Sequence, residues 1–143
     1  MRTRATLLAT SLAVAVLATT AGCSFGWGPS VFEDEQVAAD ALPDGQEAVD
    51  TLAPESSRLL GDAEGSRWWA ARNEAGEFCL VKAVVRTGGA LDDVFAGCGG
   101  DEGGGMSVED GDGVRGTWSA VADPEVPDGS TLLREHLIVT PAP

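Results

Sequence analysis

The stretch SRWWAARNEAGEFCLVKAVV, residues 66–85, decides how this chain is expected to fold. Two runs rich in aromatic and β-branched residues, 66–72 and 77–85, flank the short loop 73–76, which ends in a glycine. This pattern predicts a β-hairpin. Successive residues of a strand point to opposite faces, and both faces of 77–85 are largely apolar although Lys82 lies on one of them. We therefore expect this strand at the centre of a sheet, covered on both sides.

Strand patterns continue toward the C-terminus. Residues 106–109 and 114–122 flank the turn sequence Asp-Gly-Asp-Gly at 110–113, which predicts a second hairpin, and 132–140 forms a last strand. The fold class expected is mainly β: a small antiparallel sheet of about five or six strands. One short helix, predicted over 34–42 from the spacing of its apolar residues, precedes the sheet.

The first 23 residues have the layout of a secretory signal. Arg2 and Arg4 form a basic start, 5–18 is an apolar run, and small residues precede Cys23. The apolar run is too short to cross a membrane as a helix, which takes about 20 residues. We therefore expect export of the chain.

The sequence Ala21-Gly22-Cys23 resembles the lipobox of bacterial lipoprotein precursors, although Thr20 stands where that motif usually has leucine. The resemblance implies cleavage before Cys23, a diacylglycerol on its thiol, and a mature protein tethered to the extracytoplasmic face of a cell membrane. Secretion without a lipid and retention by the uncleaved segment are the alternatives.

Three segments are expected on this basis. Residues 1–22 are a signal peptide, 23–56 a flexible lipid-anchored spacer, and 57–143 a small β-rich extracytoplasmic domain. Prolines interrupt the spacer, and its charges are nearly all acidic.

Charge excludes one class of partner. The chain has 9 basic and 23 acidic residues and a formal net charge of −14. Binding to phosphate backbones needs clustered lysine and arginine, so nucleic acid is not an expected partner. A strongly acidic surface instead helps an extracytoplasmic protein to stay in solution.

The cysteines fit an oxidising compartment. If Cys23 carries a lipid, Cys79 and Cys98 remain as an even pair, and disulfides persist outside the cytoplasm. We predict a structural disulfide between them, since their spacing is not that of a redox-active Cys-x-x-Cys motif.

Candidates for catalysis are sparse. His136 is the single histidine, and a triad needs a nucleophile held beside it. The adjacent Asp92 and Asp93 could imitate the carboxylate pair of a glycosidase, but in so acidic a chain they are expected as solvated surface. We expect no catalytic residue.

Metal binding is also not expected. Zinc prefers cysteine and histidine ligands, which are scarce here. Carboxylates suited to calcium cluster at Glu109, Asp110 and Asp112, with Asp101 and Glu102 nearby. The ligand spacing of an EF-hand is absent, and Asp-Gly pairs are what a tight turn demands. We therefore predict a turn and no cofactor.

Several stretches resemble small lipoprotein-type envelope proteins of Actinobacteria. They are Pro54-Glu55-Ser56-Ser57-Arg58-Leu59-Leu60-Gly61, Trp68-Trp69-Ala70-Ala71-Arg72, Gly76-Glu77-Phe78-Cys79-Leu80-Val81, and the shorter Asp40-Ala41-Leu42-Pro43 and Cys98-Gly99. The resemblance implies the location and the cysteine pair, and no catalytic residue.

The function expected is a non-enzymatic interaction or binding module of the cell envelope. Its partners would be the membrane, through the lipid, and an envelope protein or ligand that the sequence does not name. A small envelope hydrolase and a purely structural or accessory lipoprotein are the alternatives. An exposed apolar patch would favour binding, and a cleft with a perturbed acid or base would favour the hydrolase.

Overall fold

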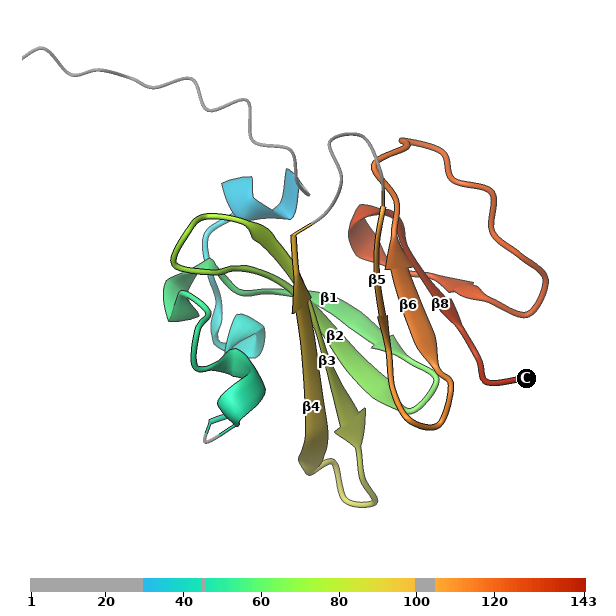
Figure 1. Cartoon of the computed structure of the whole chain (residues 1–143), viewed down its shortest axis with the longest axis horizontal. Coiled ribbons are helices and arrows are strands. Elements are labelled where there is room, and N and C mark those ends of the chain that lie inside the picture. Colours follow the sequence, from blue (N-terminus) through green and yellow to red (C-terminus); the bar gives the residue numbers. More distant parts are fainter. Residues whose placement is uncertain (1–29, 45, 100–104) are drawn as a thin grey trace, which may run out of the picture.

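The computed structural model describes residues 30–44, 46–99 and 105–143 (Figure 1). Its strands form two four-stranded antiparallel sheets that face each other. The first sheet has the order β1-β2-β3-β4, and the second has the order β5-β6-β8-β7. The first comprises β1 (Arg58–Ala63), β2 (Ser66–Arg72), β3 (Phe78–Val85) and β4 (Leu91–Cys98). The second comprises β5 (Met106–Glu109), β6 (Arg115–Trp118), β7 (Thr131–Leu132) and β8 (Leu137–Thr140).

The predicted fold class, mainly β and antiparallel with one disulfide, is confirmed. The hairpin expected from 66–85 is β2 and β3, in which Arg72 pairs with Phe78 next to the loop. Two details differ from the expectation. The described residues form two sheets of four strands each, whereas one sheet of five or six strands was expected, and 91–98, where no strand was predicted, is the edge strand β4. Two aspartates and a glycine interrupt the apolar pattern of β4, which hid it in the sequence.

The last expected strand, 132–140, is divided. A 3-10 turn, η5 (Arg134–His136), separates β7 from β8, and the backbone φ angles of Glu135 and His136 are 54° and 61°. Positive φ is incompatible with an extended strand, so the chain turns back on itself there. As a result β7 pairs with β8.

One hydrophobic core lies between the two sheets. Trp68, Leu80 and Leu137 are at its centre, and each has 2% or less of its surface exposed. Gly116 on β6 lets the Trp68 ring approach the second sheet closely, because a Cβ atom at that position would collide with the ring. The sheets are thus joined by a tryptophan on one strand fitting over a glycine on another.

A second core lies on the other face of the first sheet. Trp69 and Val81 are buried there beneath Leu52 from the N-terminal segment. Trp68 and Trp69 therefore point to opposite faces, as expected for neighbours on a strand. Both faces of β3 are covered, in agreement with its predicted central place.

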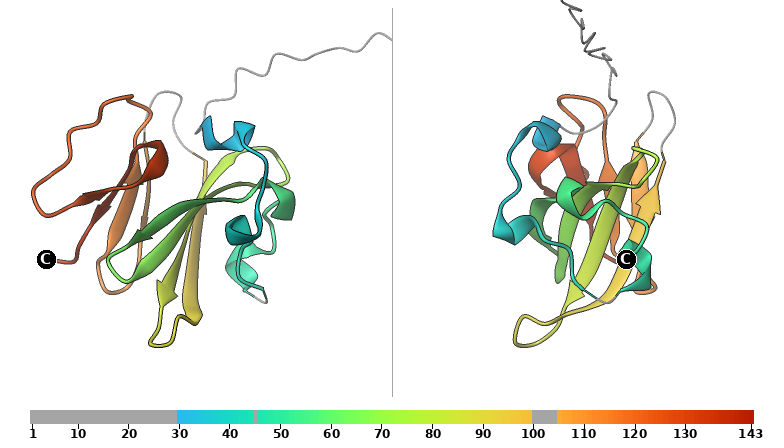
Figure 2. Two further views of the ribbon diagram at one scale, coloured as in Figure 1. Left: turned by 180° about the vertical axis from the view of Figure 1, so that it is seen from behind. Right: turned by 90° about the vertical axis from the view of Figure 1, so that its left-hand side faces the viewer.

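The N-terminal segment, 30–56, supplies that cover (Figure 2). Within its described residues it has four short 3-10 turns and no α-helix. These turns are η1 (Ser30–Glu33), η2 (Ala38–Asp40), η3 (Glu47–Val49) and η4 (Pro54–Ser56). Of the helix predicted over 34–42, the structure has only η2. The Asp40 carboxylate accepts a hydrogen bond from the backbone N–H of Val37 at 2.8 Å, and such local bonds compete with a helix.

This arrangement differs from the flexible spacer predicted over 23–56. Val31 is 1% exposed and Leu52 is 4% exposed, so these two side chains of the segment belong to the hydrophobic cores. The prolines that suggested a spacer do break helices, but they leave apolar side chains free to pack on a sheet. Residues 23–29 lie outside the described residues. No helix in the described part of the chain is long and apolar enough to cross a membrane.

Candidate functional site

The candidate binding site is a pocket of about 590 Å³ within the N-terminal segment. Its apolar lining comes from Ala41, Leu42, Pro43, Val49, Leu52 and Pro54. Its polar lining consists of Gln36 and three carboxylates, Asp44, Asp50 and Glu55. The three acidic residues are exposed, and no basic residue lines the pocket. Volumes of about 300–1,000 Å³ are typical of ligand pockets.

Hydrogen bonds between distant parts of the segment hold this pocket in shape. The side-chain amide of Gln36 donates to the carbonyl of Pro54 at 2.8 Å and to the hydroxyl of Ser57 at 2.9 Å. The backbone N–H of Ala53 donates to the carbonyl of Arg72 on β2 at 2.8 Å. The pocket is therefore built on the first sheet rather than on a free loop.

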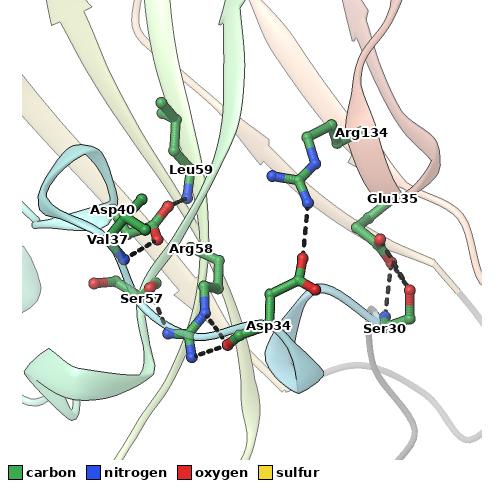
Figure 3. A network of polar contacts seen from close by, with 9 residues as sticks. All are labelled: Ser30, Asp34, Val37, Asp40, Ser57, Arg58, Leu59, Arg134 and Glu135. Atoms are coloured by element: carbon green, nitrogen blue, oxygen red, sulfur yellow. Dashed lines mark hydrogen bonds and ion pairs between the residues drawn. The ribbon is translucent and has the colours of Figure 1, made fainter.

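The segment is fixed further by buried polar groups (Figure 3). Asp40 is 5% exposed, and its carboxylate also accepts a hydrogen bond from the backbone N–H of Leu59 at 2.7 Å. The Arg58 guanidinium donates to the backbone carbonyl of Asp34 at 2.6 and 3.0 Å. Buried polar groups are tolerated only when they are hydrogen-bonded, and these are.

A second set of polar contacts ties the same segment to η5. The Glu135 carboxylate accepts hydrogen bonds from the backbone N–H of Ser30 at 2.7 Å and from its hydroxyl at 3.0 Å. Arg134 forms an ion pair with Asp34 at 3.0 Å (Figure 3). The first described residues of the chain are thus attached to both sheets.

The most unusual charged group is Lys82 in the core between the sheets. Its side chain has no exposed surface, and its ammonium group donates to the Asp110 carboxylate and, at 3.3 Å, to the carbonyl of Val114. The Trp68 ring lies 5.3 Å away, within the range of a cation–π interaction.

The pKa of Asp110 reflects this pairing. Burial by itself raises the pKa, but the hydrogen bond from Lys82 and those from the backbone N–H groups of Val114 and Asp112 outweigh it. The net result is a pKa below the ordinary value for aspartate. The turn at 110–113 therefore holds its first aspartate in the charged form, as the partner of a buried lysine.

The residues weighed as catalytic candidates in the sequence, His136 and the pair Asp92 and Asp93, lie in a turn and on the surface. His136 lies in the η5 turn, and its contact with Ser119 runs through the main chain, where its carbonyl accepts a hydrogen bond at 3.2 Å. Asp92 and Asp93 each pair with Arg86 on the surface. Neither His136 nor the pair Asp92 and Asp93 lines the pocket in the N-terminal segment.

The predicted turn at 110–113 is present. The Asp110 side chain accepts hydrogen bonds from the backbone N–H groups of Asp112 and Val114 at 3.0 and 2.9 Å, which is the local bonding typical of aspartate in turns. Residues 30–44, 46–99 and 105–143 contain no group of three or more histidine, cysteine or acidic side chains that could hold a metal ion. Asp101 and Glu102 lie outside the described residues.

The predicted disulfide is confirmed. Cys79 on β3 and Cys98 on β4 face each other across the sheet, and their Cα atoms are 4.0 Å apart. The bond fastens the edge strand β4 to the central strand β3. Cys23, the predicted lipidation site, lies outside the described residues.

Comparison of the chain with protein-family models, curated proteins and solved structures finds no match. The site therefore has to be interpreted from its own geometry.

Proposed function

We propose that the protein is an exported lipoprotein, anchored through Cys23, that acts as a non-enzymatic binding module of the cell envelope. The observation that carries the proposal is the basic and apolar N-terminus ending in Ala21-Gly22-Cys23. The bond between Cys79 and Cys98 supports it, because stable disulfides belong to oxidising compartments. That bond also uses the other two of the three cysteines.

The pocket in the N-terminal segment is the proposed contact with a partner. The apolar residues of the lining favour burial of an apolar side chain of the partner, and the carboxylates of Asp44, Asp50 and Glu55 favour a positive charge beside it. The partner would therefore present an apolar group next to a lysine, an arginine or another cation. Asp62, Arg67 and Asp110, whose partners shift their pKa values, do not line the pocket.

Anchoring is tested by Cys23→Ser. In the producing cells the wild-type protein should be found with the membranes, and mass spectrometry should give a mature N-terminus at a lipid-modified Cys23. The variant should be released or remain an unprocessed precursor. A wild-type N-terminus mapped well away from Cys23 would contradict the proposal. Stable anchoring by more than one acyl chain is expected, because a single chain binds only marginally.

Binding is tested by crosslinking in intact cells followed by mass spectrometry. The variant Asp50→Lys reverses a charge at the pocket, and Asp128→Lys makes the same change at an exposed position outside it. A partner of the pocket should be captured by the wild type and by the Asp128 variant but lost with the Asp50 variant. Equal capture by all three proteins would show that the pocket is not the contact.

A further inference from the structure

The chain enters the folded domain at a fixed point. Ser30 is bound through both its backbone N–H and its hydroxyl by Glu135. The next residue, Val31, is 1% exposed and belongs to the core between the sheets. Ser30 therefore cannot move far from η5 without exposing a core residue and breaking the contacts with Glu135.

Further contacts place this entry point at one end of the two sheets. The Phe32 ring lies 6.3 Å from the Phe78 ring at the start of β3. The Arg72 guanidinium stacks over the Phe32 ring, 4.4 Å from its centre. Phe78 in turn lies 4.8 Å from Trp118, the last residue of β6. This end, which carries η1, η5 and the start of β3, is called here the entry end (Figure 1).

The opposite end of the first sheet is formed by the turn between β3 and β4. The backbone N–H of Arg86 donates to the carbonyl of Ala90 at 2.8 Å and closes this turn, which contains the exposed Thr87. Strand β3 has eight residues and joins the two ends. At about 3.3 Å per residue the ends are about 25 Å apart.

The chain between Cys23 and Ser30 is short compared with the domain. Seven peptide units separate the two residues. An extended chain covers at most about 3.3–3.6 Å per residue, so the two Cα atoms lie within about 25 Å of each other in any conformation. If Cys23 carries a lipid, Ser30 must stay within that distance of the membrane surface.

We propose that the entry end faces the lipid bilayer and that the turn between β3 and β4 points away from it. The inference rests on the proposed lipid anchor at Cys23. The occupant of the entry end is the surface of the membrane that holds the anchor, because Ser30 lies at that end and the chain length keeps it within about 25 Å of Cys23.

Acidic residues at the entry end differ in their surroundings. Asp34 is paired with Arg134 and the Glu135 carboxylate accepts hydrogen bonds from Ser30, whereas Glu33 of η1 is exposed. The chain as a whole is strongly acidic, so an anionic bilayer would repel it and the covalent anchor has to oppose that repulsion. A zwitterionic bilayer is therefore the appropriate surface for a first test.

The test measures the heights of two labels above the bilayer. Val121 follows β6 at the entry end and is 62% exposed, while Thr87 lies in the opposite turn. Full-length Val121→Cys and Thr87→Cys proteins, purified in lipidated form, are labelled with a fluorophore and placed in zwitterionic vesicles with acceptor lipids. Energy transfer should put the label at 121 nearer the bilayer than the label at 87, with a height difference of at most about 25 Å, the length of β3.

A lengthened chain provides the control. Inserting about fifteen Gly and Ser residues between Cys23 and Ser30 leaves the folded residues unchanged and extends the reach of the tether. The height difference should then fall toward zero. Equal heights for the two labels in lipidated wild-type protein would overturn the proposal, as would a label at 87 that lies nearer the bilayer than the label at 121. Failure of the anchor itself would be recognised separately, because unlipidated protein would not join the vesicles.

Discussion

The ion pair between Lys82 and Asp110 connects the two sheets, and removing only one of its partners should destabilise their packing. Lys82 lies on β3 of the first sheet, and Asp110 lies in the turn between β5 and β6 of the second. Their side chains are 0% and 6% exposed. Removing one member of such a buried pair costs about 3–5 kcal/mol, because the other charge is left without a partner.

We predict that Asp110→Asn lowers the free energy of unfolding at pH 7 by about 3 kcal/mol, a large part of the 5–15 kcal/mol typical of a domain. Asparagine has nearly the same shape and can still accept the backbone hydrogen bonds of the turn, so the loss isolates the charge. A matched control is Asp62→Asn. Asp62 pairs with Arg67, but these side chains are 55% and 36% exposed, and exposed pairs contribute only about 0.2–1 kcal/mol.

The double variant Lys82→Met/Asp110→Asn removes both charges while keeping nearly the same side-chain volumes, so it shows whether an unpaired charge causes the loss of stability. Methionine keeps most of the volume of the lysine stem and removes the buried charge, so stability should return to within about 1 kcal/mol of the wild type. Urea unfolding followed by tryptophan fluorescence measures all four proteins, since Trp68 lies 5.3 Å from the Lys82 ammonium group. An Asp110→Asn protein as stable as the Asp62→Asn protein would refute the reasoning.

Acid should weaken the same contact. The pKa of Asp110 is lower in the folded protein than its ordinary value of about 4. A carboxyl group with a depressed folded pKa stabilises the protein fully above its unfolded pKa, and this contribution is lost as the pH falls through the folded pKa. The wild type should therefore lose stability below about pH 4 more steeply than Asp110→Asn. Parallel curves for the two proteins would contradict the assignment.

Three further predictions concern other parts of the fold. Replacing both Cys79 and Cys98 by alanine should cost roughly 3 kcal/mol by the chain-entropy model for their separation of 19 residues; a midpoint of denaturation unaffected by reductant would argue against this. Gly116→Ala should cost about 1–3 kcal/mol, because the new methyl group meets a tryptophan ring, whereas Gly111→Ala has open space around it and should be nearly neutral in thermal unfolding. Asp40→Ala leaves two backbone N–H groups without their acceptor and should cost about 1–3 kcal/mol, with faster proteolytic cleavage within 30–56. Unchanged cleavage would mean that this carboxylate does not hold the segment.

The sequence was informative where a physical signal is local. Two strand-like runs around a glycine-containing loop predicted the hairpin of β2 and β3, and two cysteines in a chain expected to be exported predicted the disulfide. The placement of β3 at the centre followed from its two apolar faces. These signals need only neighbouring residues and composition, so no knowledge of the tertiary fold is required to use them.

What the sequence did not predict depends on residues far apart in the chain. The packing of 30–56 is supported by the Asp40 carboxylate, which accepts a hydrogen bond from a backbone N–H of β1, and by the Glu135 carboxylate, which accepts one from Ser30. The residues around Asp40 and Glu135 in the sequence do not indicate these partners. Lys82 gave a signal, since it is a single lysine in an apolar strand, but not the identity of Asp110 as its counter-ion. The pocket was not predicted for the same reason, because its lining comes from the segment for which the sequence predicts a flexible spacer.

The bond between Ser30 and Glu135 also has a consequence for the order of folding. It joins residues 105 positions apart, whereas the first sheet forms from the continuous stretch 58–98 and the second from 106–140. Local pairings form sooner than distant ones, because closing a long loop carries an entropic cost before any contact compensates it. The attachment of Ser30 to η5 is therefore completed only after the C-terminal residues have folded. The contacts of 34–56 with β1 and β2 join residues closer in the sequence and can form earlier, so the final step of folding is the docking of Ser30 onto η5.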